Sequence, residues 1–377
     1  IEGALAVLLY MNRTLSAPES MNLFMNISQS DSLLSANAHA EDHANAADIF
    51  SYWENKFFLA KLSDDISEAR NIKPSSLKVY LFNIEKLHDK IYSNRDITNL
   101  KFLQKKDKVM KAIEDMKLSS RKTYLASIVV ALSSQGDQYE SEIKFYRDEM
   151  EDLAKQYSTE QEEQKMNEKE KDNWTSLASL RKVMRNYRNE LKERKVFQKD
   201  ADSITNKEFD LLQKWVVAGL YVLDDNPPLR NDYIMDVITN KEYSQLSDKE
   251  KTEKNYLVVK SRNSKFFSLG DYKTSGKYGT KEIEVGKKLN AMLNIWLKFN
   301  TTGHLLLNSK KEPMTPNGLT KYLNKTFEPS GKSNISSSLI RHIFITEKIG
   351  GPTLKEKQEI ADKMGHSVGQ QELYKKH

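Results

Sequence analysis

The last 37 residues of the chain carry an Arg, a His and a Tyr at intervals that suit chemistry on a phosphodiester. Arg341 is followed by Gly365-His366-Ser367, and Tyr374 lies eight residues after His366. A guanidinium is always charged and binds two phosphate oxygens at once, a His or Lys can supply a proton, and a Tyr hydroxyl can form a covalent phosphoester. The spacing therefore predicts cleavage and rejoining of a phosphodiester, with Tyr374 as the nucleophile.

Two upstream cations extend this set. Arg230 comes shortly after the helix-breaking segment Asn226-Pro227-Pro228, and Lys273 lies between two runs that are typical of strands. An Arg in such a turn and a Lys in such a hairpin are ordinarily surface residues, so it is their order with the C-terminal groups that makes them candidates. Other lysines of the same region are alternatives to Lys273, namely Lys260, Lys265 and Lys277.

Composition limits the class of protein. At 377 residues, with 38% hydrophobic and 30% charged residues, the chain is long enough for two domains with cores of their own. A net charge of +6 suits a polyanionic partner. The absence of cysteine excludes disulfides and thiolate metal sites, and the seven His lack metal-site spacing, so we expect neither a metal nor a cofactor. No apolar run approaches the ~20 residues that cross a bilayer.

The chain divides into four segments by composition. Residues 1–47 are expected to be a disordered or non-native N-terminal extension, and residues 48–136 a helical domain. Residues 137–172 are densely charged and contain neither Gly nor Pro, which predicts a solvated helix or linker rather than part of a core. Apolar content resumes in residues 173–377, the second domain.

Two helices are expected within the first domain, each with apolar residues at intervals of three or four. One begins near Pro74 and the other near Ser119. The first turn of the second helix offers hydroxyls, backbone N–H groups and cations, which suit a phosphate, although an ordinary capped surface helix has the same composition. The candidate phosphate contacts are Ser119, Ser120, Arg121 and Lys122.

The second domain is predicted to be mostly helical with a small sheet inside it. Strand-like runs occupy Tyr256–Lys260, Phe266–Tyr272 and Lys281–Val285. The segment from Lys287 onwards is mostly helical, and residues 370–376 are expected to form a helix that carries Tyr374. The predicted fold class is mainly α with a small antiparallel β-sheet.

These motifs together resemble the tyrosine recombinases, the phage-type integrases and their relatives in mobile elements and large DNA viruses. That family uses an Arg, a hairpin Lys, a His-x-x-Arg box, a Gly-His box and a Tyr in the last helix. Residues 174–377 match these boxes in order, and residues 48–135 resemble the helical core-binding domain of the family. Each box alone is weak, whereas five in this order are specific.

The resemblance implies a function and roles for the residues. Tyr374 would attack the scissile phosphate, while Arg230, Arg341 and His366 stabilise the transition state and Lys273 protonates the leaving oxygen. Asp232 would brace the site, and Lys277 and the first turn near Ser119 would contact DNA. The implied partners are duplex DNA and three further protomers, which form a tetramer on DNA in whichever compartment holds the target. No metal, ATP or membrane is implied.

The sequence departs from the family at one position. Ser338 stands three residues before Arg341, where the family most often has a His. A hydroxyl can bond a phosphate oxygen but is a poor proton acceptor at neutral pH, and the neighbouring His342 either compensates or faces the core. Two alternatives therefore stay open: a type IB topoisomerase-like enzyme that relaxes DNA, and a catalytically inactive DNA-binding relative.

Overall fold

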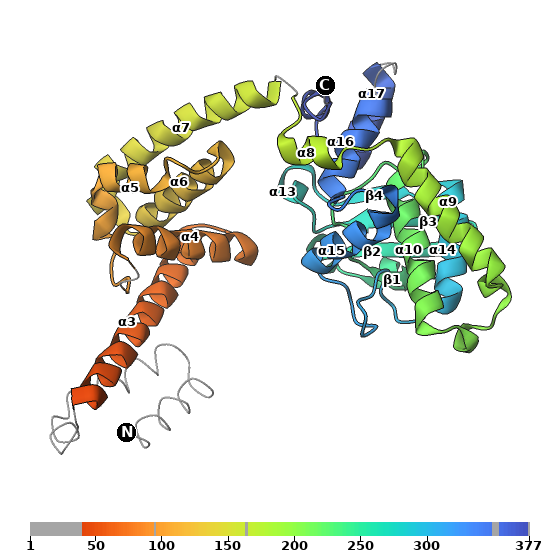
Figure 1. Ribbon diagram of the computed structural model, residues 1–377, viewed down its shortest axis with the longest axis horizontal. Helices are drawn as coiled ribbons and strands as arrows, with labels where there is room; N and C mark the ends of the chain where they lie inside the picture. The colour runs from red at the N-terminus through yellow and green to blue at the C-terminus, as the bar shows by residue number, and fades with distance from the viewer. Residues whose placement is uncertain (1–39, 94–95, 163–164, 349–353, 376–377) are drawn as a thin grey trace. The chain divides into compact units, whose positions relative to one another are not determined.

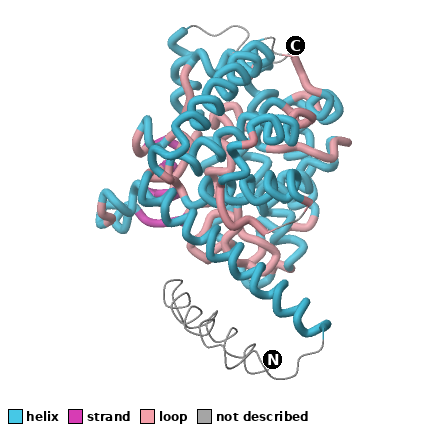
Figure 2. The backbone as a smooth tube through the Cα atoms, turned by 90° about the vertical axis from the view of Figure 1, so that its left-hand side faces the viewer, coloured by secondary structure: helices cyan, strands magenta, loops and turns pink. Residues whose placement is uncertain are grey.

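Helices form most of the chain in the computed structural model, which describes residues 40–93, 96–162, 165–348 and 354–375 (Figures 1 and 2). The chain divides into two units, residues 1–160 and 161–377. The strands of the described residues all lie in the second unit, where Figure 1 labels them β1 to β4. The predicted fold class, mainly helical with one small sheet, is confirmed. No helix in this part of the chain has an apolar stretch long enough to cross a membrane.

The first unit is built from helices alone within its described residues. They are α3 (Ala40–Ala69), α4 (Pro74–Tyr92), η1 (Lys101–Gln104), α5 (Lys106–Ile113), α6 (Leu118–Ser133), η2 (Gly136–Tyr139) and α7 (Glu140–Glu162). The expectation of disorder for residues 1–39 lies outside the described residues. Residues 40–47 form the beginning of α3, so the expected boundary after residue 47 falls inside a helix.

The core of this unit is formed by the faces that the periodicity predicts. Pro74 occupies the first turn of α4, where its missing N–H costs nothing. Ile84 and Leu87 of α4 are buried, as are Leu125 and Ile128 of α6. A buried hydrogen bond of 3.0 Å from Asn83 Nδ2 to Ser127 Oγ also joins the two helices, so their register is fixed by a polar contact as well as by packing.

The densely charged segment 137–172, predicted as a solvated helix or linker outside any core, is largely helical but contributes side chains to a core. Its first part forms α7, and Tyr146 is fully buried there, with its hydroxyl donating to the Leu103 carbonyl at 2.6 Å. Leu153 is buried in the same core. The reason is an apolar stripe at intervals of three or four residues, which the surrounding charges hide in the composition. The stripe contains Tyr139, Ile143, Tyr146, Met150 and Leu153.

The second unit surrounds a four-stranded sheet with helices. Before the sheet come α8 (Glu168–Asn173), α9 (Leu177–Glu193), η3 (Val196–Gln198), η4 (Ala201–Ser203) and α10 (Asn206–Val222). The sheet region comprises β1 (Asp236–Thr239), α11 (Asn240–Gln245), α12 (Asp248–Glu253), β2 (Asn255–Ser261), β3 (Ser264–Leu269), α13 (Ser275–Tyr278) and β4 (Lys281–Glu284). It is followed by α14 (Lys287–Phe299), α15 (Pro316–Phe327), η5 (Glu328–Ser330), α16 (Ser337–Lys348), α17 (Leu354–Met364) and α18 (Val368–Glu372).

The sheet has the strand order β1-β2-β3-β4. Strands β2, β3 and β4 pair antiparallel, at the three places where strands were predicted, and β1 adds to β2 in parallel, which makes the sheet mixed. Leu257, Phe267 and Ile283 lie in one cross-strand row and join the main core. Tyr256, Val258 and Phe266 face the other side, where side chains of α11 cover them. Both faces are therefore buried, which explains the strands' continuous hydrophobic character.

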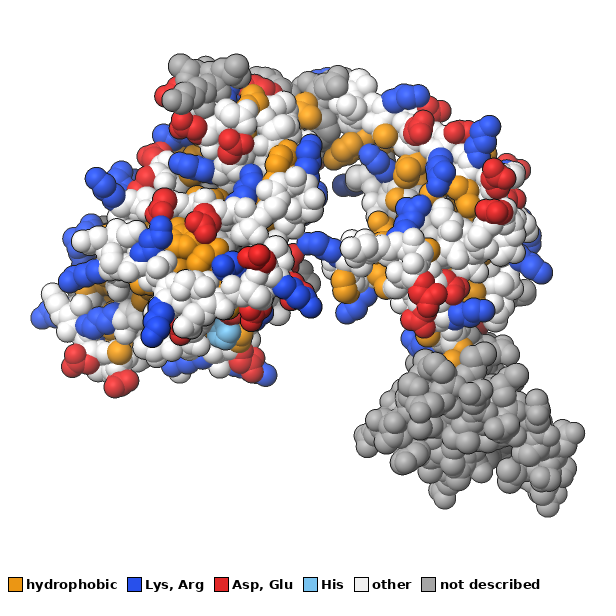
Figure 3. All heavy atoms as spheres, turned by 180° about the vertical axis from the view of Figure 1, so that it is seen from behind, with side chains coloured by type: hydrophobic (Ala, Val, Ile, Leu, Met, Phe, Trp, Pro, Cys, Tyr) orange, Lys and Arg blue, Asp and Glu red, His pale blue; other side chains and the backbone are white. Residues whose placement is uncertain are grey.

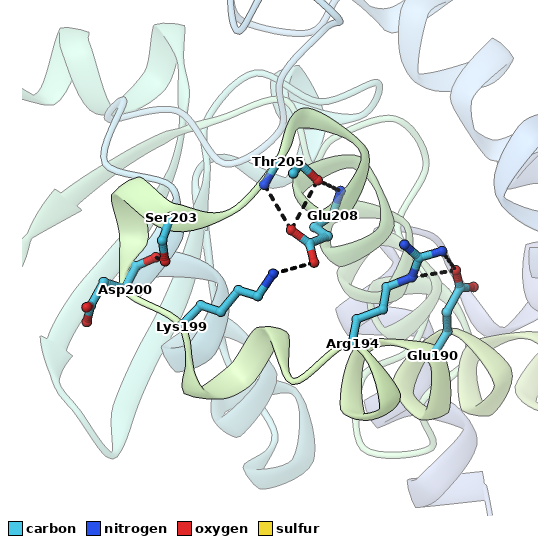
Figure 4. A network of polar contacts seen from close by, with 7 residues as sticks. All are labelled: Glu190, Arg194, Lys199, Asp200, Ser203, Thr205 and Glu208. Atoms are coloured by element: carbon cyan, nitrogen blue, oxygen red, sulfur yellow. Dashed lines mark hydrogen bonds and ion pairs between the residues drawn. The ribbon is translucent and has the colours of Figure 1, made fainter.

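Helix α10 begins with a capping box. Thr205 Oγ1 accepts from the Glu208 backbone N–H at 3.2 Å, and the Glu208 carboxylate accepts from the Thr205 N–H at 2.9 Å (Figure 4). Lys199 Nζ lies 2.7 Å from the same carboxylate, and this bond is the largest cause that lowers the pKa of Glu208 to about 2. The box fixes the start of a helix whose other end leads to Arg230.

The surface carries charges of both signs. On the face shown in Figure 3, Lys and Arg side chains are interspersed with Asp and Glu over the described residues of both units. On this face, side chains of the two signs therefore lie side by side.

Asn255, the first residue of β2, ties two loops together. Its side-chain Oδ1 accepts from the Gly270 and Asp271 N–H groups, both at 3.0 Å. Its Nδ2 donates to the carbonyls of Asp271 at 2.8 Å and Asp232 at 3.3 Å. One buried amide therefore connects the loop of Arg230 with the loop that precedes Lys273.

We expect Asn255→Ala to lower the free energy of unfolding by about 1–3 kcal/mol, because the Asp271 N–H loses its acceptor and the Asp232 and Asp271 carbonyls lose a donor, while the Gly270 N–H keeps its bond to the Lys254 carbonyl. Guanidinium denaturation followed by tryptophan fluorescence would measure the change. Asn263→Ala, in the exposed β2–β3 turn, is the matched control and should change stability by less than about 0.5 kcal/mol. Equal effects of the two substitutions would contradict the role given to Asn255.

Candidate active site

Tyr374 lies among the groups that the sequence singled out. Its hydroxyl is 3.4 Å from Arg230 Nη2, and its ring stacks on the His366 imidazole with centroids 5.3 Å apart and planes at 10°. The Arg341 guanidinium carbon lies 5.4 Å from the centroid of the Tyr374 ring. The structure thus brings together four predicted residues that are up to 144 positions apart in sequence.

The loop after α10 holds Arg230 in place through buried polar groups. Asn226 Nδ2 donates to the Leu220 carbonyl at the end of α10 and to the Tyr233 hydroxyl, at 3.1 and 2.8 Å. The Tyr221 hydroxyl donates to the backbone carbonyl of Arg230 at 2.7 Å. Because both ends of the loop are bonded to α10, the Arg230 backbone is fixed while its side chain extends to Tyr374.

Arg341 is only 1% exposed, which is unusual for a cation. Its Nη1 donates to the Pro228 carbonyl at 2.7 Å and its Nη2 to the Met364 carbonyl at 3.3 Å. Its Nε is buried without a partner among the described residues. Burial lowers the pKa of Arg341, and the charge of Arg230 acts in the same direction.

His366 follows a tight turn that joins α17 to α18. Gly365 has a φ of +70°, which favours glycine, and its carbonyl accepts from Thr274 Oγ1 at 2.9 Å. His366 is 5% exposed; its Nδ1 lies 3.2 Å from the Ser367 carbonyl, while its Nε2 has no partner in the described part of the chain. Burial, followed by the charge of Arg341, lowers the pKa of His366 to about 4, so the imidazole is neutral at pH 7.

The electrostatics of the site favour a negative charge on Tyr374. Burial alone would raise the pKa of the Tyr374 hydroxyl, but the charges of Arg341 and Arg230 outweigh it and lower the pKa below its usual value of 10.0. Asp232, the predicted brace, lies close to both arginines, yet burial raises the pKa of its carboxyl. The site therefore holds two guanidinium groups near one carboxyl group and is poised to receive an anion.

Lys273 occupies the connection between β3 and β4, as the hairpin prediction has it, and its side chain is exposed. The next residue, Thr274, donates to the Gly365 carbonyl, so the Lys273 backbone lies beside the turn of His366. Lys277, on α13, is exposed and lies with its Nζ 5.3 Å from the centroid of the Tyr278 ring. The β3–β4 connection thus carries both lysines exposed, with the Lys273 backbone beside the turn of His366.

Lys281 is a basic group that the sequence reading missed. Its Nζ donates to the Asp362 carbonyl at 2.8 Å, and its charge contributes to lowering the pKa of His366. The side chain is half-buried, and burial lowers the pKa of Lys281 itself. The sequence does contain a signal for Lys281: it is the first residue of a predicted strand and follows the two hairpin lysines. Lys265, an alternative to Lys273, is buried against α14 and bonded to Asn290 and Asn294.

At the start of α16, the hydroxyl that bonds to the Arg230 loop is that of Ser337. Ser338 is exposed in the first turn of α16, whereas the Ser337 hydroxyl donates to Asn231 Oδ1 at 2.9 Å. Asn231 directly follows Arg230, so Ser337 links α16 to the Arg230 loop. His342 does not simply face the core: its ring stacks on Tyr374, with centroids 4.7 Å apart.

The predicted helix over residues 370–376 is shorter than expected. Helix α18 ends at Glu372, and Tyr374 lies in the following turn, where its N–H donates to the Gln371 carbonyl at 3.1 Å. Gln370 is exposed while Gln371 is buried, so Gln370 and Tyr374 do not share the buried face that a continuous helix would give them. The segment is instead held by tertiary interactions, the burial of the Gln371 side chain and the contact of His342 with the Tyr374 carbonyl, neither of which is visible in the sequence.

The candidate phosphate contacts of the first unit lie on α6. That helix begins at Leu118, and its N-cap is Lys117, which makes no side-chain capping bond. Ser119 and Ser120 are exposed, whereas Arg121 and Lys122 are half-buried. The hydroxyls therefore do not cap the helix.

No cluster of three or more His, Asp or Glu side chains suited to a metal occurs in the residues the structure describes.

We expect the pKa of His366 to make the stability of the protein depend on pH. Below pH 6.5 an unfolded chain protonates this imidazole, whereas the folded protein does so only near pH 4, so the free energy of unfolding falls as the pH falls through this window. Between pH 7 and pH 5 the contribution is about 2 kcal/mol. Denaturation at both pH values should show a smaller fall for His366→Gln than for the unchanged protein; equal falls would refute the assignment.

Comparison with known proteins adds little to this geometry. No protein-family model matches the chain, and no curated protein matches it either. Among solved structures, the chain is weakly similar to the crystal structure of XerA recombinase, with 8% sequence identity and a TM-score of 0.34 over 85% of this chain and 93% of that one. A similarity at this TM-score carries no argument, so the function has to be argued from the residues of the site.

Proposed function

We propose that this chain is a DNA strand transferase of the tyrosine-recombinase type, which cleaves and rejoins duplex DNA through a 3′-phosphotyrosyl intermediate. The observation that carries the proposal is the Tyr374 hydroxyl, 3.4 Å from one guanidinium group and beside a second, buried one. Two guanidinium groups around a nucleophile suit the non-bridging oxygens of a phosphodiester, which they bind as charged donors.

Unpaired polar atoms support a phosphate ligand. Arg341 Nε and His366 Nε2 are buried without partners in the described residues, and an unsatisfied buried polar group costs about 1–3 kcal/mol. A phosphate placed between them would accept from Arg341. Its negative charge would also oppose the two arginines that keep the His366 pKa low, which favours the imidazolium form and a second donated bond.

The reaction follows as a balanced transesterification. Tyr374 loses its proton to solvent, which the low pKa of its hydroxyl eases, and the phenolate oxygen forms a bond to phosphorus. The bond from phosphorus to the 5′-oxygen breaks, and this oxygen takes a proton from Lys273. The reverse steps rejoin the strand. Because the phosphoester bond is replaced by another, no ATP is consumed, and the charges that a metal would supply come from Arg230 and Arg341.

This proposal reduces the importance of Ser338. A strong base at that position is dispensable where neighbouring cations lower the pKa of the nucleophile. Duplex DNA is the proposed partner, with further contacts from Lys277 and the first turn of α6, and the proposed working assembly is a tetramer on DNA. The exposed positions of Lys277, Ser119 and Ser120 are compatible with such contacts.

The first test is a covalent adduct. The protein is incubated with an end-labelled pool of nicked duplexes whose sequence around the nick is randomised, so that cleavage releases a short fragment and traps the intermediate. We expect label that stays on the protein in denaturing gels, and its loss in Tyr374→Phe. Tyr278→Phe, an exposed tyrosine of the same unit, is the control. Absence of any adduct from the unmutated protein would refute the proposal.

The second test concerns the metal. We expect adduct formation to continue in excess EDTA at an unchanged rate, because the proposed transition state is stabilised by guanidinium groups. Arg230→Gln should slow the same step by about 100-fold or more, a loss typical of one electrostatic donor. Loss of adduct on chelation, with recovery on adding Mg²⁺, would contradict the proposed chemistry.

A further inference from the structure

His342 holds the backbone of Tyr374 as well as its ring. Its Nδ1 lies 2.9 Å from the Tyr374 carbonyl oxygen, and the two rings stack with centroids 4.7 Å apart and planes at 28°. Because a carbonyl oxygen only accepts, the imidazole Nδ1–H is the donor in this contact. His342 directly follows Arg341 on α16, so one helix supplies both the buried cation and the contact to the Tyr374 backbone.

The other side of the His342 ring faces a carboxylate. Nε2 lies 3.8 Å from Glu170 Oε1, and both side chains are largely buried, at 14% and 17% exposed. Each ring nitrogen of His342 therefore faces an oxygen. At 3.8 Å the Nε2 contact is an ion pair rather than a hydrogen bond, and it attracts the imidazolium form of the ring, in which Nε2 also carries a proton.

Glu170 is itself held by the helix on which it lies. Its Oε2 accepts from the Asn167 N–H at 3.0 Å in the capping box of α8. Helix α8 is further bonded to the second unit by Lys332 Nζ, which donates to the Asp172 carbonyl at 2.7 Å. Helix α8 is the first helix that lies wholly within the second unit. Glu170 thus anchors the imidazole to an element that neither binds phosphate nor reacts.

We propose that His342 is a positioning residue for the nucleophile: it fixes the turn that carries Tyr374, and Glu170 fixes His342. The proposal rests on the proposed function, since it assigns how the same tyrosine is presented to the phosphate. The turn follows the short helix α18, so its geometry depends on such outside contacts. A displacement of about 1 Å in a reacting group can slow a reaction by about 100-fold.

The variants separate this role from simple packing. His342→Asn keeps an amide nitrogen where Nδ1 donates, His342→Gln places its amide near Nε2 instead, and His342→Leu removes both donors. Glu170→Gln keeps the acceptor for the Asn167 N–H but loses its charge. Glu168→Gln on the same helix is the matched control, because Glu168 is exposed and forms an ion pair with Lys171 of that helix.

Two quantities are measured for each variant: the single-turnover rate of adduct formation on the nicked duplex pool, and the affinity for the same DNA by fluorescence anisotropy. We expect His342→Leu and His342→Gln to slow adduct formation by about tenfold or more, His342→Asn to recover most of the rate, and Glu170→Gln to slow it about threefold. DNA affinity should stay within about twofold, and Glu168→Gln should behave as the unmutated protein.

The failure of this inference is distinct from that of the proposed function. An unmutated protein that forms the adduct, with His342→Leu cleaving at the same rate, would overturn the positioning role alone. An equal loss in His342→Asn and His342→Leu would also overturn it, because the donated bond would then be irrelevant. If the unmutated protein forms no adduct, the ¹⁹F resonance of 3-fluorotyrosine at position 374 still decides: it should shift in His342→Leu and Glu170→Gln, and an unchanged resonance would refute the contact.

Discussion

The site depends on the burial of one cation, Arg341. A guanidinium removed from water must find acceptors, or its burial destabilises the fold by several kcal/mol. The acceptors here are the Pro228 and Met364 carbonyls. Pro228 lies two residues before Arg230, Met364 lies two residues before His366, and the guanidinium also lies against the Tyr374 ring. The solvation of one charge therefore gathers three segments that are distant in sequence, each of which carries one of the predicted site residues Arg230, His366 and Tyr374.

This burial also sets the chemical character of the site. Arg230 is close enough to Arg341 to lower its pKa, so the two cations repel each other, and the Asp232 carboxyl between them is itself disfavoured by burial. The fold thus holds an excess of positive charge at the Tyr374 hydroxyl, at some expense to its stability. Such an excess is relieved by an anion, either the phenolate of Tyr374 or a phosphate that approaches it.

The sequence predicts the members of the site better than their roles. The order of Arg230, Arg341, His366 and Tyr374 is visible because each stands in a local motif with a helix or turn signal. The alternation of strands β2, β3 and β4 is visible for the same reason. The exposure of Ser338 and the bond of its neighbour Ser337 to Asn231 depend instead on the rotation of α16 about its axis, which tertiary packing fixes. No local pattern encodes that rotation.

Two further features were not predictable from the sequence: where the last helix ends, and which side of a densely charged helix packs into the core. At the turn of Tyr374, Gln371 is buried and His342 contacts the Tyr374 carbonyl, and both are interactions with distant segments that no local pattern encodes. In α7, the apolar stripe that includes Tyr146 is present in the sequence, but the charges around it dominate the composition. Periodicity is thus the more reliable guide than average composition when a helix packs only one narrow face.

The residues of the site differ in how firmly the fold holds them, and the proposed reaction explains the difference. In the proposed reaction Arg341 and His366 meet the phosphate in a fixed geometry, and both are buried and bonded to backbone carbonyls. The proposed acid, Lys273, is exposed on the β3–β4 connection, yet the Thr274 bond to Gly365 keeps that connection beside His366. A leaving oxygen belongs to the DNA and takes its place only when DNA is bound. A donor on an exposed loop can follow that oxygen, whereas the buried Arg341 could not move without losing the Pro228 and Met364 carbonyls that accept from it.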